Sequence, residues 1–170
     1  PVADIEFGEL ILITIHLADS NGNPIAGIVD LNGTKVIIYD DGIGTFLIDT
    51  QPDVGQYTFV ATYAGDNEYN ASISEPMTFN VTPKVIDPDD VVVDIDTGNE
   101  FGDDIPVTIN STVDGIYTVN VNGTVVDVEV INGTGSAVIP ALSAPGIYNA
   151  TVTIDNDNYA LDMTTDDFEY

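Results

Sequence analysis

The strongest structural pattern in this sequence lies in the stretch 55–70, which reads GQYTFVATYAGDNEYN. Apolar residues at every second position, from Tyr57 to Tyr63, alternate with Thr and Val, as expected for a strand with one face in a core. The turn-forming run 64–67 then ends the pattern. A weaker version, GIYNATVTIDNDNY, recurs at 146–159. The sequence therefore predicts a tandem repeat of one module of about 85 to 90 residues.

Shorter matches support the interpretation as a repeat. Glu-Phe-Gly-Glu at 6–9 is matched by Glu-Phe-Gly-Asp at 100–103, and both copies carry an Asn-Gly-Thr hairpin turn. The chain at the junction is rich in Pro and Asp, which favours a short and stiff connection. We therefore expect a first module over 1–83, a linker over 84–90 and a second module over 91–170.

The rest of the chain reads as short strands separated by turn residues, and no stretch shows helical periodicity over ten residues. About seven short strands per copy are typical of two packed sheets with Greek-key connections. The predicted fold class is all-β, with two tandem β-sandwich domains. In the first module, strands are expected over 2–7, 10–18, 28–31, 35–39, 44–48, 55–63 and 76–82.

The charge balance narrows the classes of partner. The chain has 29 acidic and 2 basic residues, a formal net charge of -27. A phosphate backbone would be repelled, and only Lys35, Lys84 and His16 could contact it, so we expect no nucleic-acid partner. Three interpretations of the charge remain: a self-repelling surface protein, adaptation to high salt, or binding of divalent cations.

Cysteine is absent, which removes disulfides, thiol nucleophiles and cysteine-ligated metals from consideration. The apolar run at 10–13 is far shorter than the roughly 20 residues that span a bilayer, so we expect no membrane insertion. The sequence begins at Pro1 without Met or a basic leader, which predicts a processed or excised piece of a longer protein.

The pattern Gly-x-Tyr-x-x-x-Ala-x-Tyr-x-Gly-Asp-x-x-Tyr, from Gly55 to Tyr69, resembles the immunoglobulin-like (Ig-like) repeats of adhesin-like cell-surface proteins. Such repeats occur in bacteria and, with similar richness in Ile, Asn and Asp, in methanogenic archaea. The resemblance covers essentially the whole chain and is stronger in the first copy; in the second, Tyr63 is replaced by Ile154. It implies Ig-like sandwiches at the cell surface that serve as spacers or adhesive modules, and it carries no catalytic residues.

Seven Asn-x-Ser/Thr triplets are candidate N-glycosylation sites. Asn and Thr are both common here and three triplets also form hairpin turns, so composition and turn formation are alternative explanations. Strand alternation turns Asn80, Asn110 and Asn149 away from the core, so we expect these side chains to face solvent. The candidates are Asn32, Asn70, Asn80, Asn110, Asn122, Asn132 and Asn149.

Aspartates gather at the junction and in one loop of the second copy. Ca²⁺ prefers six to eight oxygen ligands, which such clusters could supply, although acidic loop residues are also often simply solvated. Neither stretch has the spacing of an EF-hand loop. The candidate Ca²⁺ ligands are Asp87, Asp89, Asp90, Asp155 and Asp157.

The sequence does not favour an enzyme. His16 is the only histidine, no serine has the context of a nucleophile, and no Trp is present to line a glycan cleft. Leu10 and Leu12 stand on the strand face opposite the core-facing isoleucines. They predict either a local contact under a loop or an interface, including strand exchange between protomers.

Together these observations predict a non-catalytic extracellular protein at the cell surface, whose tandem Ig-like modules act as a stalk, an adhesive surface or both. The expected partners are a cell-surface or cell-wall glycan or protein, or neighbouring copies of the chain. The alternative is a structural subunit of an extracellular filament or surface layer that assembles through exposed strands.

Overall fold

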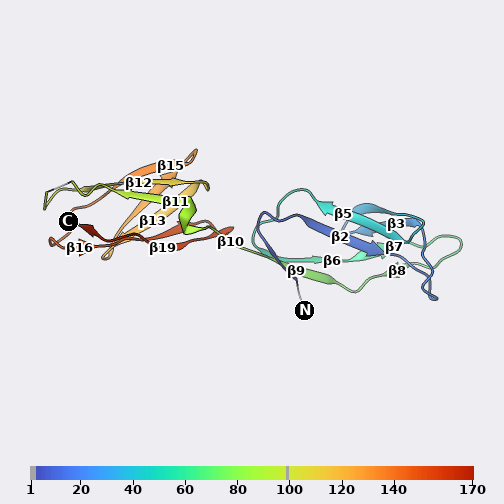
Figure 1. Cartoon of the computed structure of the whole chain (residues 1–170). Coiled ribbons are helices and arrows are strands. Elements are labelled where there is room, and N and C mark those ends of the chain that lie inside the picture. Colours follow the sequence, from blue (N-terminus) through green and yellow to red (C-terminus); the bar gives the residue numbers. More distant parts are fainter. Residues whose placement is uncertain (1–2, 99) are drawn as a thin grey trace. The chain divides into compact units, whose positions relative to one another are not determined.

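The computed structural model describes residues 3–98 and 100–170, and nearly all of its regular elements are β-strands (Figure 1). The chain divides into two compact units, Pro1–Thr82 (unit 1) and Pro83–Tyr170 (unit 2). Only Pro83 separates the last strand of unit 1 from the first strand of unit 2. No helix in the described part of the chain is long and apolar enough to cross a membrane.

Unit 1 forms sheets with the strand orders β4-β3-β7-β8, β2-β5 and β1-β9-β6. Burial in β2 alternates strictly, with Ile11, Ile13 and Ile15 facing the core, as the sequence pattern predicts. Most pairs are antiparallel, but β1 lies parallel to β9. The strands are β1 (Ala3–Glu6), β2 (Ile11–His16), β3 (Gly27–Leu31), β4 (Thr34–Ile38), β5 (Ile43–Ile48), β6 (Gly55–Phe59), β7 (Ala61–Tyr63), β8 (Ser72–Ile73) and β9 (Met77–Thr82).

Unit 2 forms sheets with the orders β14-β13-β17-β19, β11-β12-β15, β16-β20 and β10-β18. Its core surrounds the fully buried Tyr117. The elements are β10 (Lys84–Val85), a 3₁₀ helix η1 (Pro88–Asp90), β11 (Val91–Ile95), β12 (Ile105–Ser111), β13 (Gly115–Val121), β14 (Thr124–Val130), β15 (Thr134–Ile139), β16 (Ile147–Tyr148), β17 (Thr151–Asp155), β18 (Tyr159–Ala160), β19 (Asp162–Thr164) and β20 (Phe168–Glu169).

The predicted fold class is confirmed: both units are all-β, Ig-like sandwiches. The β2-β5 and β4-β3-β7 pairings of unit 1 have counterparts in the β12-β15 and β14-β13-β17 pairings of unit 2. Each unit also has a tyrosine whose hydroxyl donates to a backbone carbonyl four residues upstream. Tyr57 donates to Asp53 at 2.7 Å and Tyr148 to Ala144 at 2.9 Å. This is the tyrosine corner that recurs in Ig-like folds.

The segment 84–90, expected as a linker, is built into unit 2. The Lys84 N–H donates to the Asn158 carbonyl at 3.0 Å, and the Ile86 N–H donates to the Ala160 carbonyl at 2.9 Å. The Ile86 side chain is buried in the core of unit 2. The Pro and Asp residues around this short apolar run hide its strand character in the sequence.

The predicted strand 55–63 is two strands that belong to different sheets. Strand β6 pairs with β9 and β7 pairs with β3, with an interruption at Val60. The Asn32 side chain fills this interruption, because its Oδ1 accepts from the Val60 N–H at 2.9 Å and its Nδ2 donates to the Thr58 carbonyl at 2.8 Å.

The interruption also changes which residues correspond between the copies. Tyr63 pairs with Val29, and Val152 pairs with Val119, where Val29 and Val119 hold the same place before their Asn-Gly turns. Tyr63 therefore corresponds to Val152 rather than to Ile154. The expected first strand, 2–7, begins at Val2, which lies outside the described residues.

Candidate functional site

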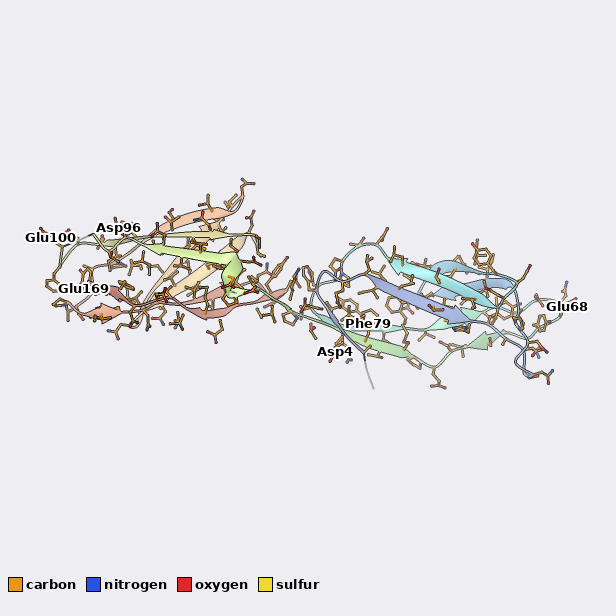
Figure 2. The ribbon with its side chains drawn as sticks, viewed as in Figure 1. Asp4, Glu68, Phe79, Asp96, Glu100 and Glu169 are labelled. Carbon is orange, nitrogen blue, oxygen red and sulfur yellow. The ribbon has the colours of Figure 1, made fainter. Side chains whose placement is uncertain are left out.

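The loop that follows β7 is held by one carboxylate. Asp66 accepts hydrogen bonds from the backbone N–H groups of Glu68 and Tyr69 and from the Tyr63 hydroxyl, each at 2.8 Å. These three hydrogen bonds lower the pKa of Asp66. The bond from the Glu68 N–H has the largest effect, and the bonds from the Tyr63 hydroxyl and the Tyr69 N–H come next. The bond to Asp66 raises the pKa of Tyr63. The Gly-Asp-x-x-Tyr motif is thus a structural loop, and Glu68 lies at its tip (Figure 2).

The seven candidate sequons fall into two groups. In three of them the amide nitrogen donates a hydrogen bond: Asn32 to Thr58, Asn80 to Asp4 at 2.9 Å and Asn149 to Asp167 at 3.2 Å. The side chains of the other four are exposed and form no hydrogen bond with the described residues; these are Asn70, Asn110, Asn122 and Asn132. Their glycosylation stays a prediction.

The acidic clusters are solvent-exposed. Asp87 caps η1, because its Oδ1 accepts from the Asp89 N–H at 3.0 Å. Asp155 ends β17, and Asp157 follows in the next loop. Within residues 3–98 and 100–170, no group of three or more His, Cys, Asp or Glu side chains is arranged to hold a metal ion. Calcium binding at these residues stays a prediction.

Leu10 and Leu12 both face away from the core of unit 1. Leu12 lies directly opposite Leu47 in the β2-β5 pair, and their side chains are 60% and 47% exposed. Residues opposed in this way have Cβ atoms about 5 Å apart, so the two leucines form one apolar patch. His16 lies on the same outward face of β2 and is exposed.

A second outward apolar pair was not singled out from the sequence. Ile28 and Ile37 are register partners in β3 and β4, and both are more than half exposed. In unit 2 the corresponding pair is polar, because the Thr118 hydroxyl donates to Asp127 at 3.0 Å. The alternation of 28–31 against 35–39 could have revealed the pair.

The outer edge of β2 is an open strand edge of unit 1. Strand β2 pairs with β5 on one side, and no strand in the described part of the chain pairs with its other side. Two adjoining cavities of about 230 and 190 Å³ lie along this edge. Ile15, His16, Ala61 and Ser74 line both cavities.

No family model and no curated protein matches the chain. Among solved structures, it is similar to the fibronectin(III)-like modules of CbhA from Clostridium thermocellum. That similarity covers 99% of this chain and 89% of the other, at 18% sequence identity and a TM-score of 0.34.

Proposed function

We propose that this chain is a non-catalytic, extracellular pair of Ig-like modules that acts as a stalk, an adhesive surface or both in a cell-surface protein. The observation that carries the proposal is the parallel pairing of the first and last strands of unit 1. Strand β1 lies beside β9 in a register that runs from Ala3–Phe79 to Glu6–Thr82. Strand β9 then leads into unit 2 through Pro83 alone.

This pairing suits a chain that bears tension. When the ends of unit 1 are pulled apart, parallel first and last strands are loaded in shear, so their hydrogen bonds must break together. The Phe7 N–H extends the ladder by donating to the Thr82 carbonyl at 2.9 Å. On the sheet surface, Asn80 links Asp4 to Gln56 across all three strands, at 2.9 and 3.1 Å.

Stretching the whole chain by its two ends tests the stalk role. The Phe7 N–H faces β9, so the Ile5 N–H, two residues earlier, faces β9 as well. Ile5→Pro removes that donor, and we expect the unfolding force of unit 1 to fall clearly below that of the unchanged chain. Glu6→Pro is the matched control, because the Glu6 N–H donates to the Glu9 side chain instead. Equal unfolding forces for the two variants would show that the hydrogen bonds between β1 and β9 do not set the resistance of unit 1 to force.

For the adhesive role, we propose a cell-surface or cell-wall glycan or protein as partner. The outward pair Ile28–Ile37 supports a contact surface on the β3-β4 face, because apolar side chains there lack cover within unit 1. Co-sedimentation of the chain with cell envelopes tests this. The double variant Ile28→Thr/Ile37→Asp copies the polar pair of unit 2 and should bind several-fold more weakly at an unchanged melting temperature. Undiminished binding would exclude this face.

The second candidate is a structural subunit of a filament or surface layer. The Leu12–Leu47 patch favours it, since apolar side chains next to an unpaired strand edge suit contacts between copies. Sedimentation velocity over a range of concentrations separates the two functions. Polymers that Leu12→Asp abolishes would favour the filament, whereas a monomer at all concentrations would favour the stalk and adhesive module.

A further inference from the structure

Three hairpin turns of the chain share the sequence Asn-Gly-Thr. They begin at Asn32, Asn122 and Asn132, and each Asn has a positive φ, at 46°, 50° and 53° respectively. The side chain of an asparagine can close a five-membered ring onto the nitrogen of the next residue. Glycine leaves that nitrogen unshielded, because it has no Cβ. The three turns therefore place the same reactive pair in three different surroundings.

At Asn32 the side chain is fixed. Its Nδ2 donates to the Thr58 carbonyl at 2.8 Å, and its Oδ1 accepts from the Val60 N–H at 2.9 Å. Ring closure turns Cγ toward the Gly33 nitrogen and breaks the Cγ–Nδ2 bond, so both hydrogen bonds must be given up first. Each such bond is worth about a factor of five in an equilibrium constant, so the two together protect Asn32.

At Asn132 the side chain is exposed, but the backbone of the turn is held. The Asp114 carboxylate accepts from the N–H groups of Asn132 and Gly133, each at 2.9 Å. The Gly133 carbonyl accepts from the Ser111 N–H at 3.0 Å. The nitrogen that would attack is thus bound to a carboxylate, whose negative charge also opposes loss of the proton.

At Asn122 neither restraint is present. Its side chain is exposed and forms no hydrogen bond with residues 3–98 or 100–170. The Gly123 N–H donates to the Asn120 side chain at 2.8 Å. That acceptor is a neutral amide oxygen, which holds an N–H less strongly than a carboxylate does. Of the three turns, this one leaves both reacting groups with the most freedom.

We propose that Asn122 is a site of spontaneous deamidation, and that the hydrogen bonds of Asn32 to the ends of β6 and β7 protect the equivalent turn of unit 1. The Gly123 nitrogen loses its proton to hydroxide and attacks Cγ of Asn122, which forms a new N–C bond. The Cγ–Nδ2 bond breaks, and Nδ2 takes its electron pair and a proton from water to leave as ammonia. Water then adds to either carbonyl of the succinimide ring and opens it, which yields aspartate or isoaspartate.

The reaction changes the turn between β13 and β14 in two ways. It adds a negative charge to a chain whose net charge is already -27. The isoaspartate product also inserts a methylene into the backbone between Val121 and Thr124, which are register partners on either side of the turn. We expect the end of this hairpin to loosen. The inference goes beyond the proposed function and does not depend on it.

Deamidation and the predicted glycosylation compete for the same atom. Asn122 heads a candidate sequon, and an N-linked glycan would be attached to Nδ2, the nitrogen that leaves as ammonia. The experiment therefore uses the whole chain produced without glycosylation.

Ageing the folded chain at mildly alkaline pH tests the proposal. Pepsin digestion in acid, which halts the reaction, is followed by mass spectrometry to measure the fraction of aspartate and isoaspartate at each turn. We expect Asn122 to react at least about tenfold faster than Asn32, because Asn32 must first break two hydrogen bonds. The rate at Asn132 should lie between them. The chain unfolded in urea is the control, and there the three Asn-Gly-Thr sites should react at similar rates.

Variants at Asp114 test the restraint on Asn132. Asp114→Ala removes the acceptor of the Gly133 N–H, so the rate at Asn132 should rise toward that at Asn122. Asp114→Asn keeps an oxygen acceptor without the charge and should give a smaller rise. Asn122 in the same chain is the reference, and its rate should not change. The comparison of Asn32 with Asn122 needs no variant, so it stands even if a substitution prevents folding.

Two results would overturn the proposal. The first is equal rates at Asn32 and Asn122 in the folded chain, since the hydrogen bonds of Asn32 would then give no protection. The second is a folded chain without product at Asn122 after the unfolded chain has reacted fully. That result would show that the folded turn itself prevents ring closure.

Discussion

At the scale of single residues, Gly44 and Gly135 hold the points where the chain passes from one sheet to the next. A Cβ atom on Gly44 would lie 2.6 Å from the Ile37 carbonyl oxygen, and one on Gly135 would meet the Glu129 carbonyl oxygen. No side chain rotation relieves a contact with backbone. The two glycines occupy equivalent registers, so the requirement is a property of the module.

We expect Gly44→Ala to destabilise unit 1 and Gly135→Ala to destabilise unit 2, each by about 1–3 kcal/mol. For domains of this size that lowers the melting temperature by several degrees or more. Gly55→Ala is the control, because the nearest atom to its added Cβ would be 3.8 Å away. Thermal unfolding by circular dichroism checks the series, and a Gly135→Ala protein as stable as the control would contradict the packing described.

The stability of the loop that Asp66 holds in unit 1 is expected to fall in acid. Hydrogen bonds from Glu68, Tyr63 and Tyr69 lower its pKa in the folded state, so the charged carboxylate favours folding. Its contribution is fully present above the unfolded pKa of about 3.9 and is lost as the pH falls through the lower folded value.

Asp66→Asn should therefore lower the melting temperature of unit 1 at pH 6, and the difference from the unchanged chain should shrink toward pH 2. Asp19 and Asp30 also have lowered pKa values, through hydrogen bonds from Asn23 and Gly33 respectively. Both carboxylates are present in the variant and in the unchanged chain, so they do not contribute to the difference between the two. A difference in melting temperature that does not vary with pH would show that the Asp66 charge does not matter.

At the scale of elements, alternation of apolar residues predicted the longer strands that lie in one sheet, but it missed the two-residue strands β8 and β10. The isoleucines of β2 are the clearest case. Alternation could not predict the break at Val60, because residues on both sides keep the same period while their hydrogen bonds go to different sheets. It also placed Met77 inward, whereas that side chain is 42% exposed at the end of β9.

The binding features were harder to predict for the same reason. The outward position of Leu12 could be predicted from strand alternation. Its partner Leu47 and the open edge of β2 depend instead on which strands become neighbours. Pairing between distant strands is decided by tertiary packing, which the local pattern does not record.

The break between β6 and β7 gives a prediction at this scale. Asn32 and Asn122 both sit in Asn-Gly turns with positive φ, at 46° and 50°, but only Asn32 bridges two strand ends with its amide. Alanine at either position incurs the same left-handed strain. Asn32→Ala should therefore cost about 1–3 kcal/mol more than Asn122→Ala, since two backbone groups lose their partner. Urea unfolding of both variants measures the difference, and equal costs would contradict the bridging role.

At the scale of the whole molecule, the chain consists of two self-contained modules joined by one residue. Each unit has its own core, and the segment 84–90 belongs to unit 2. The units differ in how their edges are used. Unit 1 carries the parallel terminal pair and the open edge of β2, whereas β11 covers the equivalent edge of unit 2. The parallel terminal pair is the feature of unit 1 on which the proposed stalk role rests.

Stretching the unmodified chain by its two ends, with its unfolding steps recorded, tests whether the two units are independent modules. We expect two separate steps, each of which releases roughly 25 nm of chain, because each unit of about 80 to 90 residues unfolds independently. A single step of about twice that length would contradict the claim, since it would show that the two units fold as one cooperative domain.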